Sequence, residues 1–260
     1  PTISKKNISN YKVVFDEKLL PVLVFYPNKI STIENIIIYV PGDGKVNGSF
    51  SEYSNICKNM AVEANCVVVA IDYFQTTIKY PTVVNKVSKL IKYLLDEFKK
   101  LGFDKDKITL MSDSVGCKIL GSVTAKLIND GVSIDKEILF YPVVRDDYND
   151  YKWNESILNL NFNLDKRVNS YLKKYFPKDK EYNCNLLEMG YLKDFPKTMV
   201  VVGDMDIFKE DGILLGEVLM KNVDGSSYKS IEFASHGFLS SKDEEVKREA
   251  YSLVKEFINN

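Results

Sequence analysis

The feature that most constrains this chain is the alternation of short, continuous apolar runs with longer segments whose apolar residues recur at helical spacing. Continuous apolar runs are typical of strands buried on both faces, as in a parallel sheet whose strands are connected by helices. The runs lie at 35–42, 66–73, 107–112, 137–144, 198–204 and 228–234, and the helical segments at 51–64, 81–101, 114–130, 212–222 and 242–258. Two earlier runs, 11–15 and 21–27, favour an opening hairpin. The pattern predicts an α/β fold with a mostly parallel central sheet flanked by helices.

Composition narrows the class of protein. Of 260 residues, 45% are hydrophobic, which is enough for a folded core. Lys and Arg number 35 against 36 Asp and Glu, so the net charge of −1 gives no electrostatic reason to expect nucleic acid or anionic lipid as a partner. We expect no membrane span and no signal peptide, because no apolar run is long enough. Four cysteines without metal-ligand spacing favour free thiols, and therefore a cytoplasmic location.

One stretch breaks the alternation. Residues 145–197 are rich in Asn, Asp, Tyr and Lys, contain the only tryptophan, Trp153, and offer short helices but no convincing strand. The stretch is too short for an independent domain, so we expect an insertion folded over one end of the sheet. The predicted core is therefore 1–144 together with 198–260, and the predicted cap is 145–197.

Ser114 lies at the corner between the apolar run ITL and the helical segment that follows it. A nucleophilic hydroxyl must project from such a turn, which requires small residues two positions before and after it. Ser112 and Gly116 occupy those positions, giving S-x-S-x-G in place of the usual G-x-S-x-G. Taken alone, this pattern also fits a serine at the start of an ordinary helix.

A nucleophilic serine needs a base, and the chain contains a single histidine, His236, directly after the last predicted strand. The loop 203–212 after the preceding strand offers four carboxylates, Asp204, Asp206, Glu210 and Asp211. Because the carboxyl ends of parallel strands face one crevice, we expect these loops to meet Ser114 there. The order serine, acid, histidine is the one found in α/β hydrolases.

These motifs together resemble the hormone-sensitive-lipase-like branch of the α/β hydrolases, which includes bacterial carboxylesterases. The resemblance extends from about residue 35 to residue 257. The loop GDMDIFKEDG is similar to the family's G-E-x-D-P-L-R-D-E-G, and the match implies Asp206 as the triad acid beside Ser114 and His236. SHGF, YPVV and the segment 71–87, with Asp72 and Tyr73, resemble further family motifs.

At one motif this chain departs from the family pattern. Where the family has H-G-G-G, whose backbone N–H groups help to form the oxyanion hole, this chain has Pro41, Gly42, Asp43, Gly44 and Lys45. Any residue except proline can supply a backbone N–H, so we expect Asp43, Gly44 and Val115 to form the hole. A carboxylate at Asp43 would oppose the oxyanion unless it points away or pairs with Lys45. Candidate substrate-binding residues are Gly42, Trp153 and Phe238.

The resemblance implies a serine carboxylesterase that acts through an acyl-enzyme with no metal or organic cofactor, and the short cap predicts small or short-acyl esters as substrates. Tyr148 and Tyr151 could line the substrate site, but they could equally form the small core of the cap. Two alternatives stay open: hydrolysis of another acyl bond by a peptidase or amidase, and a catalytically silent fold that serves as a binding protein. The expected partner is a small-molecule ester, and homo-oligomer formation is left open.

Overall fold

The computed structural model describes residues 8–15, 18–28, 33–42, 50–73, 80–149, 151, 164–176, 185–188 and 192–260. Within this part of the chain, the apolar runs form one sheet of eight strands. The strands are β1 (Ile8–Phe15), β2 (Lys18–Phe25), β3 (Ile36–Val40), β4 (Val67–Ile71), β5 (Ile108–Asp113), β6 (Lys136–Phe140), β7 (Lys197–Gly203) and β8 (Ser227–Ile231). Their order across the sheet is β1-β2-β4-β3-β5-β6-β7-β8. β1 and β2 form the predicted hairpin, and β2 also runs antiparallel to β4. All pairs from β4 to β8 are parallel, as predicted.

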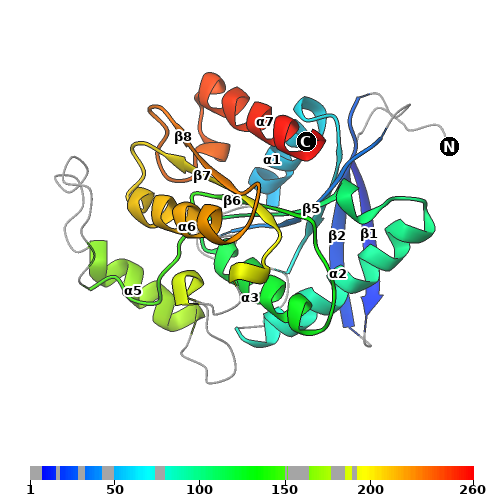
Figure 1. Cartoon of the computed structure of the whole chain (residues 1–260). Helices are drawn as coiled ribbons and strands as arrows, with labels where there is room; N and C mark the ends of the chain where they lie inside the picture. Colours follow the sequence, from blue (N-terminus) through cyan, green and yellow to red (C-terminus); the bar gives the residue numbers. More distant parts are fainter. Residues whose placement is uncertain are drawn as a thin grey trace.

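Helices cover both faces of the sheet, as Figure 1 shows. They are α1 (Phe50–Glu63), α2 (Thr82–Lys100), α3 (Gly116–Asn129), α5 (Leu164–Tyr175), α6 (Lys209–Asn222) and α7 (Glu244–Asn259). Short 3-10 turns lie at Lys105–Lys107, Leu186–Glu188, Leu192–Asp194 and Phe238–Ser240. One face packs against α2, α3 and α6, and the other against α1 and α7.

The central strand β3 shows why its sequence is a continuous apolar run. Successive side chains of a strand point to opposite faces. Ile36, Ile38 and Val40 therefore join the core beneath α2, α3 and α6, whereas Ile37 and Tyr39 join the core beneath α1 and α7. All five residues are buried, because a parallel sheet between two helical layers has no solvent-facing side.

Two strands end earlier than the sequence predicts. β6 was expected to reach residue 144 but ends at Phe140, because Tyr141 adopts a left-handed conformation (φ 35°) and Pro142 has no N–H for the ladder. β8 was expected to reach residue 234 but ends at Ile231, since Phe233 is also left-handed (φ 59°). In both cases the chain turns directly after a buried residue, Phe140 or Ile231, and the turn carries residues of the candidate site.

The predicted insertion leaves the sheet after β6 and returns at β7. In its described part, α5 and the 3-10 turns Leu186–Glu188 and Leu192–Asp194 are present, and no strand occurs before Lys197. Residues 150, 152–163, 177–184 and 189–191 lie outside the described residues, so the cap boundaries of 145 and 197 stay a prediction.

Three of the four cysteines, Cys57, Cys66 and Cys117, are free thiols buried in the core, and Cys184 lies outside the described residues. Burial raises the pKa of the Cys66 thiol to about 12, so the thiol stays protonated and unreactive. Across the helices that the structure describes, none combines the length and the apolar character needed to cross a membrane.

Candidate active site

Ser114 sits in a sharp turn between β5 and α3, in the left-handed conformation (φ 51°). Two backbone hydrogen bonds hold this turn: Ser114 N–H donates to the carbonyl of Phe140 (2.9 Å), and Val143 N–H donates to the carbonyl of Ser114 (3.2 Å). A Cβ at Gly116 would come within 2.7 Å of the carbonyl oxygen of Pro41, so only glycine fits this position. The conformation is strained for serine, and it projects the hydroxyl away from the sheet.

The hydroxyl of Ser114 meets the imidazole of His236, with 2.8 Å between Oγ and Nε2. On the other side of the ring, Nδ1 lies 3.0 Å and 3.1 Å from the two carboxylate oxygens of Asp206. A carboxylate only accepts hydrogen bonds, so the imidazole carries its proton on Nδ1 and leaves Nε2 to accept from the serine. The three side chains therefore form one continuous hydrogen-bonded series.

The environment of Asp206 differs from that of the histidine. Asp206 is only 1% exposed, and its Oδ1 also accepts the backbone N–H of Phe208 (2.8 Å). The His236 side chain is 28% exposed, so a ligand can reach it. Among the other carboxylates of the loop, Asp211 pairs with Arg145, with 2.7 Å between Oδ1 and Nε.

Aromatic rings fix the orientation of the imidazole. Phe208 and Tyr141 stand edge-on to the His236 ring, with centroid distances of 5.0 Å and 5.1 Å. Phe238, which sequence reasoning suggested as a substrate-binding residue, is 1% exposed and packs edge-on against Tyr141 and Phe140. The structure thus places Phe238 in the core behind the histidine, where its side chain is out of reach of a substrate.

The predicted oxyanion residues are only partly described. The backbone N–H of Val115 makes no hydrogen bond within the described part of the chain, so it is available to a ligand beside Ser114. Gly42 N–H, in contrast, is engaged by the carboxylate of Asp113 (2.7 Å). Asp43, Gly44 and Trp153 lie outside the described residues, and their predicted roles stay predictions.

Asp113, the residue before the serine, is a buried carboxylate that sequence reasoning did not single out. Its Oδ1 accepts from Tyr39 Oη (2.5 Å) and Gly42 N–H (2.7 Å), and its Oδ2 accepts from Tyr141 Oη (3.3 Å). Burial raises the pKa of the Asp113 carboxyl, and these hydrogen bonds together with nearby His236 act in the opposite direction. The carboxylate therefore joins β3, β5 and the turn after β6 at one point beside the triad.

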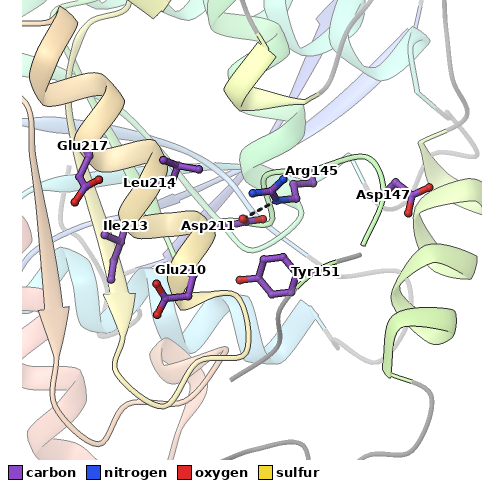
Figure 2. Close-up of a pocket in the computed structure, with 8 residues that line it drawn as sticks. All are labelled: Arg145, Asp147, Tyr151, Glu210, Asp211, Ile213, Leu214 and Glu217. Atoms are coloured by element: carbon purple, nitrogen blue, oxygen red, sulfur yellow. Dashed lines mark hydrogen bonds and ion pairs between the residues drawn. The ribbon is translucent and has the colours of Figure 1, made fainter. Parts of the chain in front are cut away.

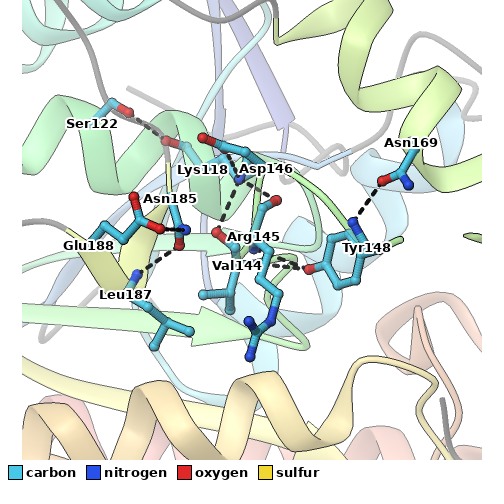
Figure 3. A network of polar contacts seen from close by, with 10 residues as sticks. All are labelled: Lys118, Ser122, Val144, Arg145, Asp146, Tyr148, Asn169, Asn185, Leu187 and Glu188. Carbon is cyan, nitrogen blue, oxygen red and sulfur yellow. Dashed lines mark hydrogen bonds and ion pairs between the residues drawn. The ribbon is translucent and has the colours of Figure 1, made fainter. Parts of the chain in front are cut away.

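Lys118 is a second charged residue that was missed, four residues after Ser114 on α3. Its side chain is 0% exposed, and Nζ donates to the carbonyls of Val144 (3.1 Å) and Arg145 (2.7 Å) and to Oδ1 of Asp146 (2.9 Å). Three donors thus have three acceptors, and Figure 3 shows them converging on the segment that follows β6. The available signal was a lysine inside the apolar stretch GCKILGSV.

The same segment is joined to α5. Tyr148 Oη accepts from the backbone N–H groups of Val144 and Arg145, and Tyr148 N–H donates to Oδ1 of Asn169 in α5 (2.8 Å) (Figure 3). A series of contacts therefore runs from α3 through the residues after β6 to α5. Tyr148 is fully buried, which fits a core residue of the insertion.

A cavity of about 760 Å³ is lined in part by Arg145 and Asp147 of this segment (Figure 2). Its lining comprises Arg145, Asp147, Tyr151, Glu210, Asp211, Ile213, Leu214 and Glu217. Rings of Tyr151, Tyr148, Phe208 and His236 follow one another at centroid distances of 5.1, 5.2 and 5.0 Å. The aromatic row therefore connects the cavity wall to the imidazole.

Comparisons with known proteins agree with this geometry. Residues 37–240 match a family described as alpha/beta hydrolase fold. Esterase LipI of Mycobacterium tuberculosis is 24% identical over 197 residues, covering 71% of this chain and 59% of that protein. The arylesterase of Saccharolobus solfataricus is 22% identical over 234 residues, covering 88% of this chain and 76% of that protein.

Solved structures show the same fold. The hyperthermophilic esterase of the archaeon Pyrobaculum calidifontis superimposes with a TM-score of 0.79 at 21% identity, covering 96% of this chain and 82% of that one. Another solved structure, described as an arylesterase, gives a TM-score of 0.79 at 20% identity and covers 99% of this chain and 86% of that one.

Proposed function

Since the chain belongs to the hormone-sensitive-lipase-like α/β-hydrolase family of esterases, we propose that it is a serine carboxylesterase in which Ser114, His236 and Asp206 form the triad. The observation that carries the proposal is the unbroken series of hydrogen bonds from Ser114 Oγ through the imidazole to a buried carboxylate. A hydroxyl, a base and an orienting acid in this sequence are the elements of nucleophilic acyl transfer.

In the acylation step, Ser114 Oγ attacks the carbonyl carbon of the ester while Nε2 of His236 takes the hydroxyl proton. The imidazolium is stabilised by Asp206 at a hydrogen-bonding distance of 3.0 Å. The oxyanion accepts hydrogen bonds from the backbone N–H groups of Val115 and, in our proposal, of Asp43 and Gly44. When the intermediate collapses, the C–O bond to the alcohol breaks and the alcohol leaves with the proton from Nε2.

In the deacylation step, water attacks the acyl-enzyme. His236 Nε2 removes a proton from the water, and the same backbone N–H groups stabilise the second oxyanion. Collapse of this intermediate releases the carboxylic acid and returns the proton to Ser114 Oγ. Asp206 is buried and keeps the histidine in one tautomer through both steps, so no further group is needed for proton transfer.

We further propose that residues 145–197 form a short cap over the carboxyl ends of the strands and restrict the acyl group to small or short chains. This segment is joined to the core by the ion pairs of Arg145 with Asp211 in α6 and of Asp146 with Lys118 in α3, and α5 is joined to its first residues by the hydrogen bond from Tyr148 N–H to Asn169. A shortened cap leaves an open site, which suits small or polar esters rather than long lipid chains.

The test is hydrolysis of p-nitrophenyl acetate, butyrate and octanoate by the wild type and by Ser114→Ala. We expect turnover of the acetate and butyrate, and a loss of at least about 10⁴-fold in kcat for the variant. Far-UV circular dichroism of both proteins shows whether the variant is folded. Covalent labelling of the wild type, and not of the variant, by a fluorophosphonate identifies the nucleophile independently of the substrate.

Each alternative has its own outcome. Activity that rises from butyrate to octanoate contradicts the short-acyl part of the proposal. Turnover of 4-nitroacetanilide at a rate comparable with that of the ester indicates an amidase, which uses the same triad. Equal background rates for folded wild type and folded Ser114→Ala, with no fluorophosphonate labelling, refute the hydrolase and favour a binding protein.

A further inference from the structure

Residues 40–42, at the carboxyl end of β3, are held by three buried side chains from other parts of the fold. We propose that these side chains, Ser112, Asp113 and Tyr73, are positioning residues that fix the start of the loop supplying the oxyanion N–H groups. The inference rests on the proposed function, because the loop after β3 has a catalytic role only if the protein carries out acyl transfer.

The first two residues of the stretch are held through their carbonyl groups. Ser112 Oγ donates to the carbonyl of Val40 (2.6 Å), and Tyr73 Oη donates to the carbonyl of Pro41 (2.7 Å). Ser112 is 0% exposed and Tyr73 is 5% exposed, so water does not compete for these carbonyls. Pro41 has no N–H of its own for sheet pairing, and a side-chain donor from outside the strand is what fixes it.

The third residue, Gly42, is held through its N–H by the carboxylate of Asp113 (2.7 Å). The two residues are also in tight contact, because a Cβ at Gly42 would come within 2.6 Å of the backbone oxygen of Asp113. Tyr39 and Tyr141 donate to the same carboxylate, which keeps it from rotating. Asp113 thus joins the residue before the loop to the residue before the nucleophile.

These contacts determine which backbone groups can reach an oxyanion. Pro41 has no N–H, and the N–H of Gly42 is already used by Asp113. Neither Pro41 nor Gly42 can therefore donate to an oxyanion, which is why the proposal assigns that role to Asp43 and Gly44. Donors to an oxyanion must be placed within about 0.5 Å to be effective, so the fixed start of the loop matters for catalysis.

Ser112 is also where this chain departs from G-x-S-x-G. A glycine at position 112 would have no hydroxyl and could not donate to Val40. The serine is therefore more than a tolerated replacement: its hydroxyl supplies one of the three contacts that hold residues 40–42. It follows that removing this hydroxyl, although it brings the motif closer to the usual small residue, lowers the rate of the chemical step.

The experiment compares Ser112→Ala, Asp113→Ala and Asp113→Asn with the wild type. Asp113→Asn keeps an amide oxygen that can accept from Gly42 N–H, so it serves as the conservative rescue. Ser122→Ala is the matched control, because Ser122 is also buried and its hydroxyl also donates to a carbonyl (2.9 Å), but within α3. The measurements are kcat and KM for p-nitrophenyl butyrate, and the Kd of an aryl trifluoromethyl ketone, determined by direct binding.

We expect kcat to fall about 10-fold in Ser112→Ala and about 10²-fold in Asp113→Ala, with KM changed less than about 2-fold, because an oxyanion contact acts in the transition state. The Kd of the ketone, whose adduct carries an oxyanion, should rise in parallel. Asp113→Asn should recover most of the loss, and Ser122→Ala should leave kcat, KM and Kd unchanged.

Several results would overturn the inference. Folded Ser112→Ala and Asp113→Ala proteins with wild-type kcat and ketone affinity show that these side chains have no positioning role. The same conclusion follows if KM rises and kcat does not change, or if Ser122→Ala loses as much activity as Ser112→Ala. Absence of ester turnover by the wild type refutes the proposed function instead, and the ketone Kd values still decide whether Ser112 and Asp113 position the loop.

Discussion

Glu137 in β6 is a fully buried carboxyl outside the active site, and its replacement by Gln tests how much the fold is destabilised by burying it. Thr124 Oγ1 in α3 donates to Oε2 (2.5 Å), whereas Oε1 has no hydrogen-bond partner among the described residues. Burial raises the pKa of Glu137 from 4.5 to about 7, and the hydrogen bond from Thr124 opposes this only in part. Glutamine keeps the shape and the acceptor for Thr124, but it carries no charge.

The expected magnitude follows from the two pKa values. Because the pKa of Glu137 is higher in the folded chain than in the unfolded chain, the folded chain binds more protons between these two pKa values. The free energy of unfolding therefore decreases as the pH rises from about 4.5 to about 7, and it remains at the lower value above pH 7. The loss is about 1 kcal/mol at pH 5 and about 3 kcal/mol at pH 8. Glu137→Gln should therefore gain about 2 kcal/mol relative to the wild type between these two pH values.

The assay is urea unfolding of both proteins at pH 5 and pH 8, followed by far-UV circular dichroism. Taking the difference between the two pH values removes any constant effect of the amide, such as an unpaired N–H in the core. Glu249→Gln, an exposed carboxylate on α7, is the control and should show no such difference. A stability change in Glu137→Gln that is the same at both pH values, within about 0.5 kcal/mol, refutes the reasoning.

Three further predictions follow from the same contacts. Lys118→Met should lower the free energy of unfolding in urea by about 3 kcal/mol, because the buried acceptors lose their donor. The control is Lys126→Met on the same helix, which breaks only a surface ion pair and should change the free energy of unfolding by less than about 0.5 kcal/mol. Asp206→Asn should lower kcat for p-nitrophenyl acetate by about 10³-fold or more with an unchanged Tm, and a loss under 10-fold would place the triad acid elsewhere. Gly203→Ala should destabilise the fold by about 2 kcal/mol in urea unfolding, since the new Cβ would lie 2.2 Å from the carbonyl oxygen of Ala234; wild-type stability would show that the backbone yields there.

The sequence alone was enough to predict the α/β fold and to bring the serine, the acid and the histidine to one edge of the sheet. Those predictions rested on the period of the apolar residues and on the rule that parallel strands share their carboxyl edge. Both can be applied to a single sequence, because they need only the positions of the apolar runs along the chain. The ends of β6 and β8 were missed, because Tyr141 and Phe233 adopt left-handed conformations that neither residue type favours.

The polar contacts behind the site could not be read from the sequence. Asp113 and Tyr39 are separated by 74 positions, and Asp113 and Gly42 by 71, so nothing local indicates that they touch. Lys118 is four residues from Ser114, but its acceptors are carbonyls more than twenty positions away. Contacts of this kind depend on the final packing of several elements, and residue type alone gave no reason to expect a fully buried lysine.

The way Lys118 holds the segment after β6 has a consequence for redesign of the protein. Lys118 Nζ donates to the carbonyl of Val144, the last residue before the proposed insertion, and to Arg145 and Asp146, the first two residues of it, so the chain leaves the core at a point that is fixed to α3. The insertion returns at β7, and the serine, the acid and the histidine all lie outside it. In the cap that we propose, the sequence after Asp146 can therefore be exchanged as a graft, which would change substrate preference while the reacting groups keep their geometry.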